Sequence, residues 1–448
     1  MKKHTWLGLA LLLLAALMAV PAAGVLFGTE TQVTTNPAGH YNPAIWGDHI
    51  VWDDYRNGNW DIYQYDLGTG TETSVCTDPV DQSNHPAIWG NHIIWVKNGT
   101  DINLYDISTG TKSSICTEPA YRWSPGIYED RIVWQDGRNG IGDIYLYNIG
   151  TGTETQVTTN TANQLSPAIW GDHIVWQDTR NDDGDIYLYD LGTGTETPVC
   201  TDPAGQWNPV FWGDRIVWQD YRNGNWDIYL YDLGTGTETP VCTEHRDQDN
   251  PAIWGDYIVW QDYRNLNWDI YLYDICSGTE MPVCTDLAGQ WRPAIWENRI
   301  VWQDTRNNYP DIYLFEIAAP TELDATVDLK PDTLRLRNKD HTITAFIELP
   351  AGADPAEIDA SSCRLDSLPI EAGEPSEVGD YDGDGVSDLM VTFDLCTAVP
   401  GTLDRRAILS LFRTVKIGRM FVDVAVTVSG EMNDGTPFSG EDTIRIRV

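Results

Sequence analysis

The chain has 448 residues and carries 67 acidic against 28 basic side chains, which gives a formal net charge of −39. This balance argues against nucleic acid and anionic membrane surfaces as partners, because both are polyanions that bind basic patches. The length exceeds what one ordinary hydrophobic core uses, so we expect several domains or an array of repeats.

The first 23 residues have the pattern of a secretory signal peptide. Lys2 and Lys3 precede an apolar run from residue 6 to residue 20, and the small residues Ala22 and Ala23 follow as a cleavage site. The apolar stretch continues to Phe27, so an uncleaved N-terminal anchor is the alternative and the only membrane contact that we expect. Both interpretations predict an extracellular or cell-surface location for the folded part.

A five-residue strand, Ile216-Val217-Trp218-Gln219-Asp220 in its clearest form, occurs seven times at intervals of 39 to 43 residues. A fixed period of this size indicates one supersecondary unit copied along the chain. Each copy contains four short runs rich in Ile, Val, Trp, Tyr and Thr, bounded by turn residues, which predicts the four-stranded blade of a β-propeller. The repeated tryptophans are Trp52, Trp95, Trp134, Trp176, Trp218, Trp260 and Trp302.

The ends of the repeat array indicate how the ring closes. The last copy ends at Ile317 without a fourth strand, whereas an extra fourth-strand pattern, Thr29–Thr35, precedes the first copy. We therefore predict that this N-terminal strand completes the last blade and removes an open sheet edge. The predicted fold class is all-β: a seven-bladed β-propeller over residues 29–317, with one-plus-three strand closure, followed by a smaller immunoglobulin-like β-sandwich.

Eight cysteines raise the question of disulfides. Five of them occupy one position of five repeats: Cys76, Cys116, Cys200, Cys242 and Cys284. Equivalent positions of neighbouring units should lie beyond the ~7 Å Cα separation that a disulfide allows, so we interpret them as small buried strand residues. Cys363 and Cys396 are the one pair for which an exported location makes a disulfide plausible, with the reduced pair as the equal alternative.

The repeat resembles a known family. The pattern Pro-Ala-Ile-Trp-Gly-Asp-His-Ile-Val-Trp-Gln-Asp-x-Arg-Asn, followed by Asp-Ile-Tyr-Leu-Tyr-Asp, is similar to TolB-type, WD-repeat-like propellers of exported proteins, especially those of archaeal cell-surface proteins. The resemblance covers Thr29 to Ile317. It implies a binding or scaffold role, although related propellers also accompany peptidase domains or act as polysaccharide lyases.

One face of the predicted disc carries the loops in which the copies diverge, namely the second-to-third loops and the inter-blade loops. Aromatic side chains beside Arg and Asp in such loops suit sugar rings or the side chains of a protein partner, so we predict a ligand-binding face. Packing between blades is the alternative role of these aromatic residues. The tryptophans concerned are Trp60, Trp123, Trp207, Trp226, Trp268 and Trp291.

Two further sets of repeated residues are interpreted as structural. An Asp-x-Arg-Asn sequence precedes the third strand in six blades, and we expect its arginine to brace the hairpin, because chemistry repeated in every unit is usually structural. These arginines are Arg56, Arg138, Arg180, Arg222, Arg264 and Arg306. The first strands end in tryptophans that we predict to be core residues: Trp46, Trp89, Trp170, Trp212, Trp254 and Trp296.

The second blade departs from the pattern because its loop is short and lacks the arginine. Asn98-Gly99-Thr100 in this loop is the one Asn-x-Ser/Thr acceptor of the chain. In an exported protein, this predicts N-glycosylation at Asn98.

The repeat ends at Ile317, and we predict a linker over residues 318–323 and a second domain over residues 324–448. Short alternating runs predict strands near residues 327–329, 333–337, 342–349, 389–393, 422–429 and 443–448. Asn433-Asp434-Gly435 predicts a hairpin turn, and apolar spacing predicts one amphipathic helix over residues 405–415. These elements favour the immunoglobulin-like sandwich.

This domain contains an acidic loop, Asp380-Tyr381-Asp382-Gly383-Asp384-Gly385-Val386-Ser387-Asp388. Carboxylates at alternate positions and a glycine at the sixth can converge on a hard cation, which predicts a structural Ca²⁺ held by Asp380, Asp382, Asp384, Asp388 and the carbonyl of Val386. The loop resembles the calcium loop of FG-GAP repeats and, more loosely, the EF-hand, from which it departs at Val391 in place of the last Glu. An Asp-rich solvated turn is the alternative.

The sequence contains no Gly-x-Ser-x-Gly, His-Glu-x-x-His or Walker motif. We therefore predict an exported, non-catalytic binding or scaffold protein of a cell surface that recognises an extracellular protein or glycan. The alternative is a carbohydrate-active hydrolase or lyase that acts at the central pocket. A carboxylate pair for that chemistry could come from Asp182, Asp183, Asp247 and Asp249.

Overall fold

The computed structural model describes residues 26, 28–116, 118–181, 183–318, 322–335, 342–350, 353–365, 368–369, 377–381, 383, 385–394, 421–432 and 436–447. The predicted signal peptide, residues 1–23, and the middle of the predicted linker lie outside these ranges. Contacts divide the chain into two units, residues 1–318 and 319–448, close to the predicted boundary. Within the described ranges, no helix has the length and apolar composition that crossing a membrane requires.

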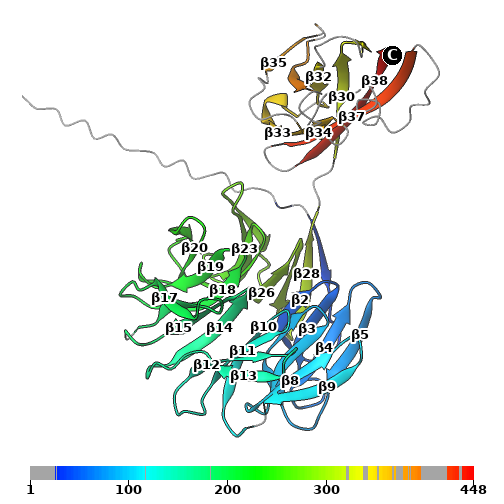
Figure 1. Cartoon of the computed structure of the whole chain (residues 1–448). Helices are drawn as coiled ribbons and strands as arrows, with labels where there is room; N and C mark the ends of the chain where they lie inside the picture. Colours follow the sequence, from blue (N-terminus) through cyan, green and yellow to red (C-terminus); the bar gives the residue numbers. More distant parts are fainter. Residues whose placement is uncertain are drawn as a thin grey trace, which may run out of the picture. The chain divides into compact units, whose positions relative to one another are not determined.

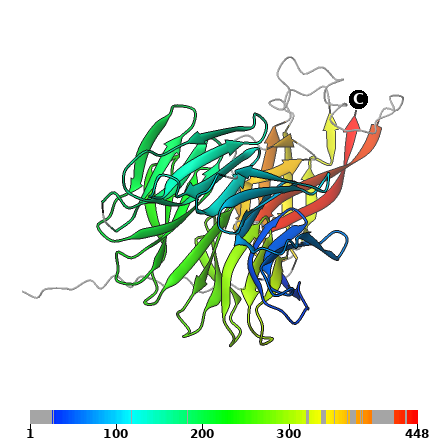
Figure 2. The same cartoon turned by 90° about the horizontal axis from the view of Figure 1, so that it is seen from below.

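The first unit is a β-propeller built from four-stranded antiparallel sheets that stand side by side around a common centre (Figures 1 and 2). Seven such sheets occur in its described part, each with a first strand nearest the centre. The first strands are β2 (His40–Trp46), β6 (Gln82–Trp89), β10 (Arg122–Tyr128), β14 (Gln164–Trp170), β18 (Gln206–Trp212), β22 (Gln248–Trp254) and β26 (Gln290–Trp296). The second strands are β3 (His49–Asp54), β7 (His92–Lys97), β11 (Arg131–Asp136), β15 (His173–Asp178), β19 (Arg215–Asp220), β23 (Tyr257–Asp262) and β27 (Arg299–Asp304).

The outer half of each sheet has two more strands. The third strands are β4 (Asp61–Asp66), β8 (Asp101–Asp106), β12 (Asp143–Asn148), β16 (Asp185–Asp190), β20 (Asp227–Asp232), β24 (Asp269–Asp274) and β28 (Asp311–Ile317). The fourth strands are β5 (Thr71–Cys76), β9 (Thr111–Cys116), β13 (Thr153–Gln156), β17 (Thr195–Cys200), β21 (Thr237–Cys242), β25 (Thr279–Cys284) and β1 (Gly28–Gln32).

The second strands form the core because both of their faces are covered by neighbouring sheets. Ile216 and Trp218 pack against Val175 of the preceding sheet, whereas Val217 packs against Trp260 of the following one. All five side chains of this group are completely buried. A strand that is apolar on both faces is the expected result for a sheet enclosed between two others.

The ring closes through the N-terminal strand. β1 pairs antiparallel with β28, from Gly28 opposite Ile317 to Gln32 opposite Tyr313, which confirms the predicted completion of the last sheet. One apolar cluster also joins Ile45 and Trp52 of the first sheet to Val301 of the last. The five repeated cysteines are buried and unpaired, as predicted. Cys396 lies outside the described residues, so its pairing with Cys363 stays a prediction.

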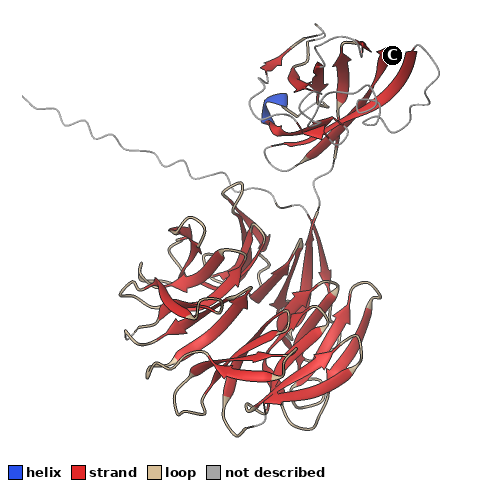
Figure 3. Ribbon diagram, in the orientation of Figure 1, coloured by secondary structure: helices blue, strands red, loops and turns tan. Residues whose placement is uncertain are grey.

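The second unit is also built from strands, and a single 3-10 turn, η1 (Pro355–Glu357), is the only helical element in its described part (Figure 3). One sheet contains β29 (Leu323–Asp324), β31 (Thr333–Arg335), β33 (Ile358–Leu365), β34 (Leu368–Pro369), β37 (Phe421–Met432) and β38 (Pro437–Arg447). The other contains β30 (Thr326–Lys330), β32 (Thr342–Glu348), β35 (Glu377–Gly379) and β36 (Asp388–Asp394).

A single apolar cluster joins the two sheets of this unit, with Ile343 and Phe393 from one sheet packed with Val426 and Phe438 from the other. The six predicted strands are present, although β38 begins earlier than expected, at Pro437. β33 was not predicted, because its polar residues Asp359, Ser361 and Ser362 obscure the apolar alternation. The predicted helix 405–415 and the turn Asn433-Asp434-Gly435 lie outside the described residues.

Candidate functional site: the axial cup and its rim

Each first strand has a β-bulge at an X-Pro pair. The pairing of β18 with β19 is interrupted between Trp207 and Val210, and the other six first strands are interrupted at the equivalent place. Proline lacks the N–H that a sheet ladder needs, so a bulge is where a strand tolerates it. We call the seven residues before these prolines the pre-proline ring: Asn42, His85, Ser124, Ser166, Asn208, Asn250 and Arg292.

All seven members of the pre-proline ring have left-handed backbones, with φ between 48° and 57°. This conformation is uncommon for residues other than glycine, and a residue before proline normally prefers an extended backbone. Such strain is retained where the surrounding structure enforces it, and it is concentrated at functional sites. The bulges therefore hold seven side chains at fixed positions around the axis.

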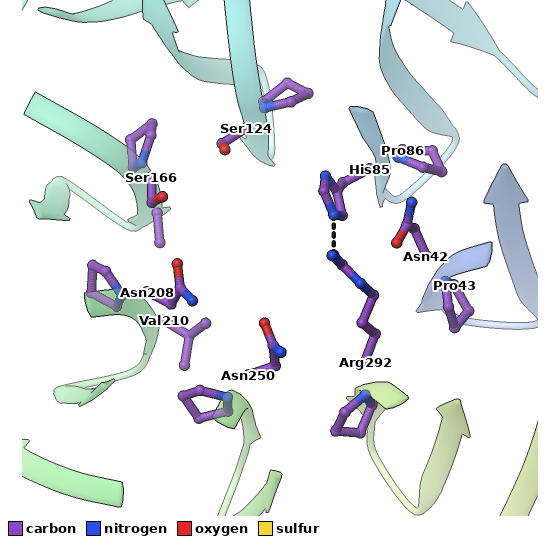
Figure 4. A pocket seen from close by; sticks show the side chains of 16 residues that line it. Asn42, Pro43, His85, Pro86, Ser124, Ser166, Asn208, Val210, Asn250 and Arg292 are labelled. Atoms are coloured by element: carbon purple, nitrogen blue, oxygen red, sulfur yellow. Dashed lines mark hydrogen bonds between the residues drawn. The ribbon is translucent and has the colours of Figure 1, made fainter. Parts of the chain in front are cut away.

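The pre-proline ring and its prolines enclose a cavity of about 430 Å³, which we call the axial cup (Figure 4). Its wall is completed by Ala168 and Val210. The polar side-chain atoms of Ser124, Ser166 and Asn250 have no hydrogen-bond partner among the described residues, so they are available to a ligand. The volume falls in the range of small-molecule sites.

Aromatic side chains close one end of the cup. They stand at the ends of the first strands and form what we call the aromatic plug: Trp46, Trp89, Tyr128, Trp170, Trp212, Trp254 and Trp296. Trp254 contacts rings in non-adjacent sheets, with centroid distances of 5.3 Å to Trp46 and 6.0 Å to Trp170. The cup is therefore open only toward the face on which the first strands begin, the face with the variable loops.

The plug corrects a prediction about the tryptophans that end the first strands. They were expected to be core residues; they are half-buried, and they pack both against the apolar clusters between the sheets and on one another across the axis. The bulge is the reason: it inserts a residue, so the side chains after it change faces relative to a regular strand.

The pre-proline ring has one charged corner. Arg292 extends from β26 past Asn42 of the adjacent β2 and donates from Nη1 to Nε2 of His85 on β6 (Figure 4). A guanidinium has no acceptor, so Nε2 of His85 must accept and the imidazole is neutral. Desolvation by the surrounding cup wall, together with the Arg292 charge, lowers the pKa of His85 to about 4, in agreement with a neutral ring.

A buried carboxyl group lies beside this corner. Asp53 of β3 is 1% exposed, and its Oδ2 accepts a 2.7 Å hydrogen bond from Nδ2 of Asn42, whereas its Oδ1 has no partner. Burial raises the pKa of Asp53 to about 7, against the lowering effects of Asn42, the His85 backbone and the Arg292 charge. In five other sheets this position holds glutamine, so Asp53 is the titratable exception behind the cup wall.

The glutamines at the equivalent position show what the repeat needs there. Oε1 of Gln219 accepts hydrogen bonds from Nδ2 of Asn208, at 3.1 Å, and from the backbone N–H of Asn250 in the next sheet, at 3.2 Å. Gln261 accepts from the backbone N–H of Arg292 in the same way. The side chain thus links the pre-proline residues of adjacent sheets and fixes the circumference of the cup.

The six predicted loop tryptophans lie on the face that surrounds the mouth, but not in one cluster. Trp207 is 42% exposed and Trp123 is 37% exposed, whereas the other four are half-buried. Trp207 packs on Trp226 at 4.9 Å and donates to the backbone of Asp183. The remaining contacts are with tyrosines: Trp60 with Tyr41 and Tyr55, Trp123 with Tyr121, Trp226 with Tyr221, and Trp268 with Tyr263.

The loop arginines brace their own hairpins, as predicted. Arg222 forms ion pairs with the completely buried Asp220 and with Glu238 of the fourth strand, both at 2.6 Å. Its guanidinium also stacks over the ring of Tyr229 at 4.1 Å and contacts Sγ of Cys200 in the preceding sheet. The same stacking on a tyrosine is found for Arg56, Arg138, Arg180, Arg264 and Arg306.

The acids considered for catalysis do not gather at the cup. Asp183 contributes its backbone carbonyl to Trp207, and Asp182 lies outside the described residues. Asp249 of β22 has a buried Oδ1 without a partner, and burial, followed by the charge of Asp247, raises its pKa to about 7. Neither Asp247 nor Asp249 lines the cavity.

The acidic loop of the second unit is described only in part. Asp380 accepts backbone hydrogen bonds from Gly383 and Gly385, and Asp388, at the start of β36, accepts one from Tyr381. Val386 is exposed, and Asp382 and Asp384 lie outside the described residues. No three potential metal-ligating side chains converge in the described part of the chain. Asn98 is exposed in the turn between β7 and β8.

Comparison with known proteins identifies the fold. No protein-family model and no curated protein sequence matches the chain. An oligogalacturonate lyase in complex with manganese superimposes with a TM-score of 0.55 at 15% identity, over 66% of this chain and 95% of the lyase. The β-propeller domain of the trilobed protease from Pyrococcus furiosus gives 0.51 at 13% identity, over 63% and 94%.

The solved structures that match also include a TolB protein from Agrobacterium tumefaciens, with a TM-score of 0.39 at 15% identity over 57% of this chain and 86% of that one. The first unit is a β-propeller. At these identities the likeness shows the fold alone, and the site has to be judged by its own residues.

Sequence reasoning overlooked the pre-proline ring, although a signal for it was present. The residue before the repeated proline varies among Asn, His, Ser and Arg within an otherwise uniform strand. Variation at one position of a repeat indicates that the fold does not require a particular side chain there. In this propeller that position lines the axial cavity.

Proposed function

We propose that this protein is a non-catalytic, exported cell-surface receptor whose axial cup binds the end of a glycan, with the loop tryptophans as its rim. The observation that carries the proposal is the pre-proline ring: rigidly held hydroxyl and amide side chains, open on one side only, around a cavity sized for a small ligand. Sugar hydroxyls both donate and accept hydrogen bonds, and Ser and Asn side chains match both roles.

The rim supports the same ligand class. Exposed Trp123 and Trp207 offer flat apolar faces near the mouth, which suit the apolar face of a sugar ring. A protein partner would need about 800 Å² on this side for a stable interface, whereas the cup selects for a narrow chain end. We therefore favour a glycan over a protein partner.

The wider architecture belongs to the proposal. We infer a seven-bladed ring with one-plus-three closure, supported by the seven sheets and by the pairing of β1 with β28. We also propose that the second unit is an immunoglobulin-like spacer stiffened by Ca²⁺ at the Asp380–Asp388 loop, and that Asn98 carries a glycan. The signal-peptide pattern of residues 1–23 is the basis for the proposed extracellular location, and the resemblance to TolB-type propellers of archaeal cell-surface proteins supports the cell surface.

A glycan array with the full chain tests the main proposal. Asn250→Gly removes a cup amide without backbone strain, because glycine accepts the left-handed conformation of that position. We expect wild type to bind a defined glycan class, Asn250→Gly and Trp207→Ala to weaken binding by about ten-fold, and Leu287→Ala, a fully exposed control, to bind normally. Loss of binding in the control alone, or no binding to any glycan, would overturn the proposal.

A lyase or hydrolase is the second candidate, and one observation favours it. Asp53 has a raised pKa and lies directly behind the cup wall, next to the corner formed by His85 and Arg292, so it is the acid–base candidate nearest to a sugar in the cup. The test is to incubate the protein with oligosaccharides and to look for cleavage products. Products formed by wild type but not by Asp53→Asn would show that the protein is an enzyme.

Calcium is tested separately. We expect Ca²⁺ to raise the unfolding temperature of the full chain and EDTA to reverse the effect. Asp380→Asn should abolish the Ca²⁺-dependent part. Identical melting curves with Ca²⁺ and with EDTA would remove the metal from the proposal.

A further inference from the structure

We propose that the ligand of the axial cup carries a single carboxylate that pairs with Arg292, so that the receptor selects acidic over neutral sugars. The inference rests on the glycan-binding function proposed above and names the class of sugar. It comes from the one charged corner of an otherwise neutral ring.

Arg292 differs from the loop arginines in forming no direct ion pair, although the Asp53 carboxyl behind the cup wall acts on its charge through space. Each loop arginine pairs with a buried aspartate and a glutamate of the same sheet, as Arg222 does with Asp220 and Glu238. No carboxylate of the described residues lies within ion-pair distance of Arg292. Its side chain lines the cavity and stays accessible to solvent at the mouth, so a ligand can reach it. A guanidinium that lines a cavity without a bonded carboxylate leaves its N–H groups free to bind an anionic group of a ligand.

The bond to His85 positions this cation without neutralising it. Because the imidazole accepts from the guanidinium, it is neutral and leaves the positive charge of Arg292 intact. The contact joins β26 to β6 past the intervening β2, so the Arg292 side chain lies along one side of the cup (Figure 4). Its other N–H groups remain for a second acceptor, and a planar guanidinium favours a carboxylate.

The opposite wall defines the rest of the ligand. Ser124, Ser166, Asn208 and Asn250 are uncharged and offer hydroxyl and amide groups. The cup therefore matches a ligand with one negative charge on one edge and several hydroxyl groups on the other, which describes a uronic acid residue. A polyanion is disfavoured, because the whole chain carries a net charge of −39.

Protonation of Asp53 should modulate this selection. The groups that face Asp53 are the side chain of Asn42 on β2, the backbone N–H of His85 on β6 and the charge of Arg292 on β26. As pH rises through about 7, Asp53 becomes a carboxylate and competes with the ligand for Arg292. The acidic ligand should therefore bind more tightly at pH 6 than at pH 8, whereas a neutral ligand should show no such trend.

A matched pair of ligands tests the inference on the full chain. Calorimetry would compare an oligosaccharide ending in a uronic acid with its methyl ester, which keeps the ring and removes the charge. We expect the acid to bind wild type about ten-fold more tightly than the ester at pH 6. Arg292→Gln should reduce the acid to the affinity of the ester, and Arg292→Lys should keep part of the preference.

The possible outcomes distinguish failure of the carboxylate assignment from failure of the proposed glycan binding. If acid and ester bind equally, or if the preference survives in Arg292→Gln, the carboxylate assignment is wrong while glycan binding stands. If neither these ligands nor neutral oligosaccharides bind, both fail. A thermal unfolding curve of Arg292→Gln that matches wild type shows that the variant is folded and that its binding reports on the cup.

Discussion

The Nζ atom of Lys112 lies 3.2 Å from the Sγ atom of Cys76, in the fourth strand of the preceding sheet. In four other sheets, a loop arginine contacts the equivalent sulfur: Arg138 with Cys116, Arg222 with Cys200, Arg264 with Cys242 and Arg306 with Cys284. The second sheet has no such arginine, and Lys112 stands where the other fourth strands have glutamate. The positive charge has thus moved from the loop to the strand.

Reversing the charge of Lys112 tests whether it replaces the loop arginine of the other sheets. Lys112 also pairs with Asp78 at 3.3 Å, and both side chains are 37% exposed. We expect Lys112→Glu to lower the free energy of unfolding by about 0.5–1 kcal/mol, because exposed ion pairs contribute little. Urea denaturation measures the change, and Lys112→Met separates loss of charge from repulsion. An unchanged stability in Lys112→Glu would show that the strand charge has no structural role.

Removing a loop arginine should lower the free energy of unfolding more than the Lys112→Glu change does. Asp220 is completely buried and accepts from Nε, Nη2 and the backbone of Arg222 as well as from Trp218. Arg222→Ala leaves this carboxylate without its cation, so we expect a loss of about 2–4 kcal/mol in urea denaturation. The control is Arg215→Ala, whose partner Asp256 is 46% exposed and which should lose less than about 1 kcal/mol. Equal losses would contradict the bracing role.

Asp53 predicts a dependence of stability on pH. Burial raises the pKa of Asp53 to about 7, above its ordinary value of 3.8, so the folded state holds a proton that the unfolded state releases. The folded state is therefore penalised as pH rises from about 4 to 7. Asp53→Gln restores the side chain of five other sheets and removes the penalty.

We expect Asp53→Gln to stabilise the protein at pH 8 by on the order of 2 kcal/mol and to have little effect at pH 4. Thermal unfolding over this pH range measures the difference. The reverse change, Gln219→Glu, places an acid at the equivalent position of another sheet and should destabilise chiefly at high pH. A gain that does not vary with pH would attribute the effect of Asp53→Gln to packing.

The aromatic plug predicts a link between stability and binding. Trp254 contacts Trp46, Trp170, Trp212 and Trp296, so Trp254→Ala should remove about 2–4 kcal/mol and open the floor of the cup. Trp207→Ala, at an exposed rim position, should cost less than about 1 kcal/mol. Urea denaturation and glycan binding should be measured on both variants. We expect Trp254→Ala to lower both the stability and the glycan affinity, whereas Trp207→Ala should lower the affinity alone.

The repeat made most of the propeller predictable. Period, strand content and the displaced fourth-strand pattern led to the sheets and to the pairing of Gly28 with Ile317, because each depends on local sequence copied many times. The arginine braces were predictable for the same reason. Residue patterns that recur in every repeat indicate contacts that stabilise the fold.

The cup was less predictable, because its geometry depends on a local exception to strand regularity. The tryptophans that end the first strands were predicted to be core residues. The bulge at residues such as Asn208 and Pro209 turns the side chains that follow it toward the other face of the sheet, so these tryptophans also meet at the axis. The charged corner is harder still. Arg292 and His85 are 207 positions apart, and only ring closure around the axis brings them together.

Ring closure also has a consequence for biosynthesis. β1 leaves the ribosome first, yet its partner β28 is separated from it by nearly the whole propeller, as the bond between Gln32 and Asp311 across 279 positions illustrates. During translation or export β1 therefore has no partner until β28 has emerged, and its unpaired edges are open to pairing with other chains. Conditions that delay emergence of residues 311–317 should accordingly increase aggregation of the nascent protein.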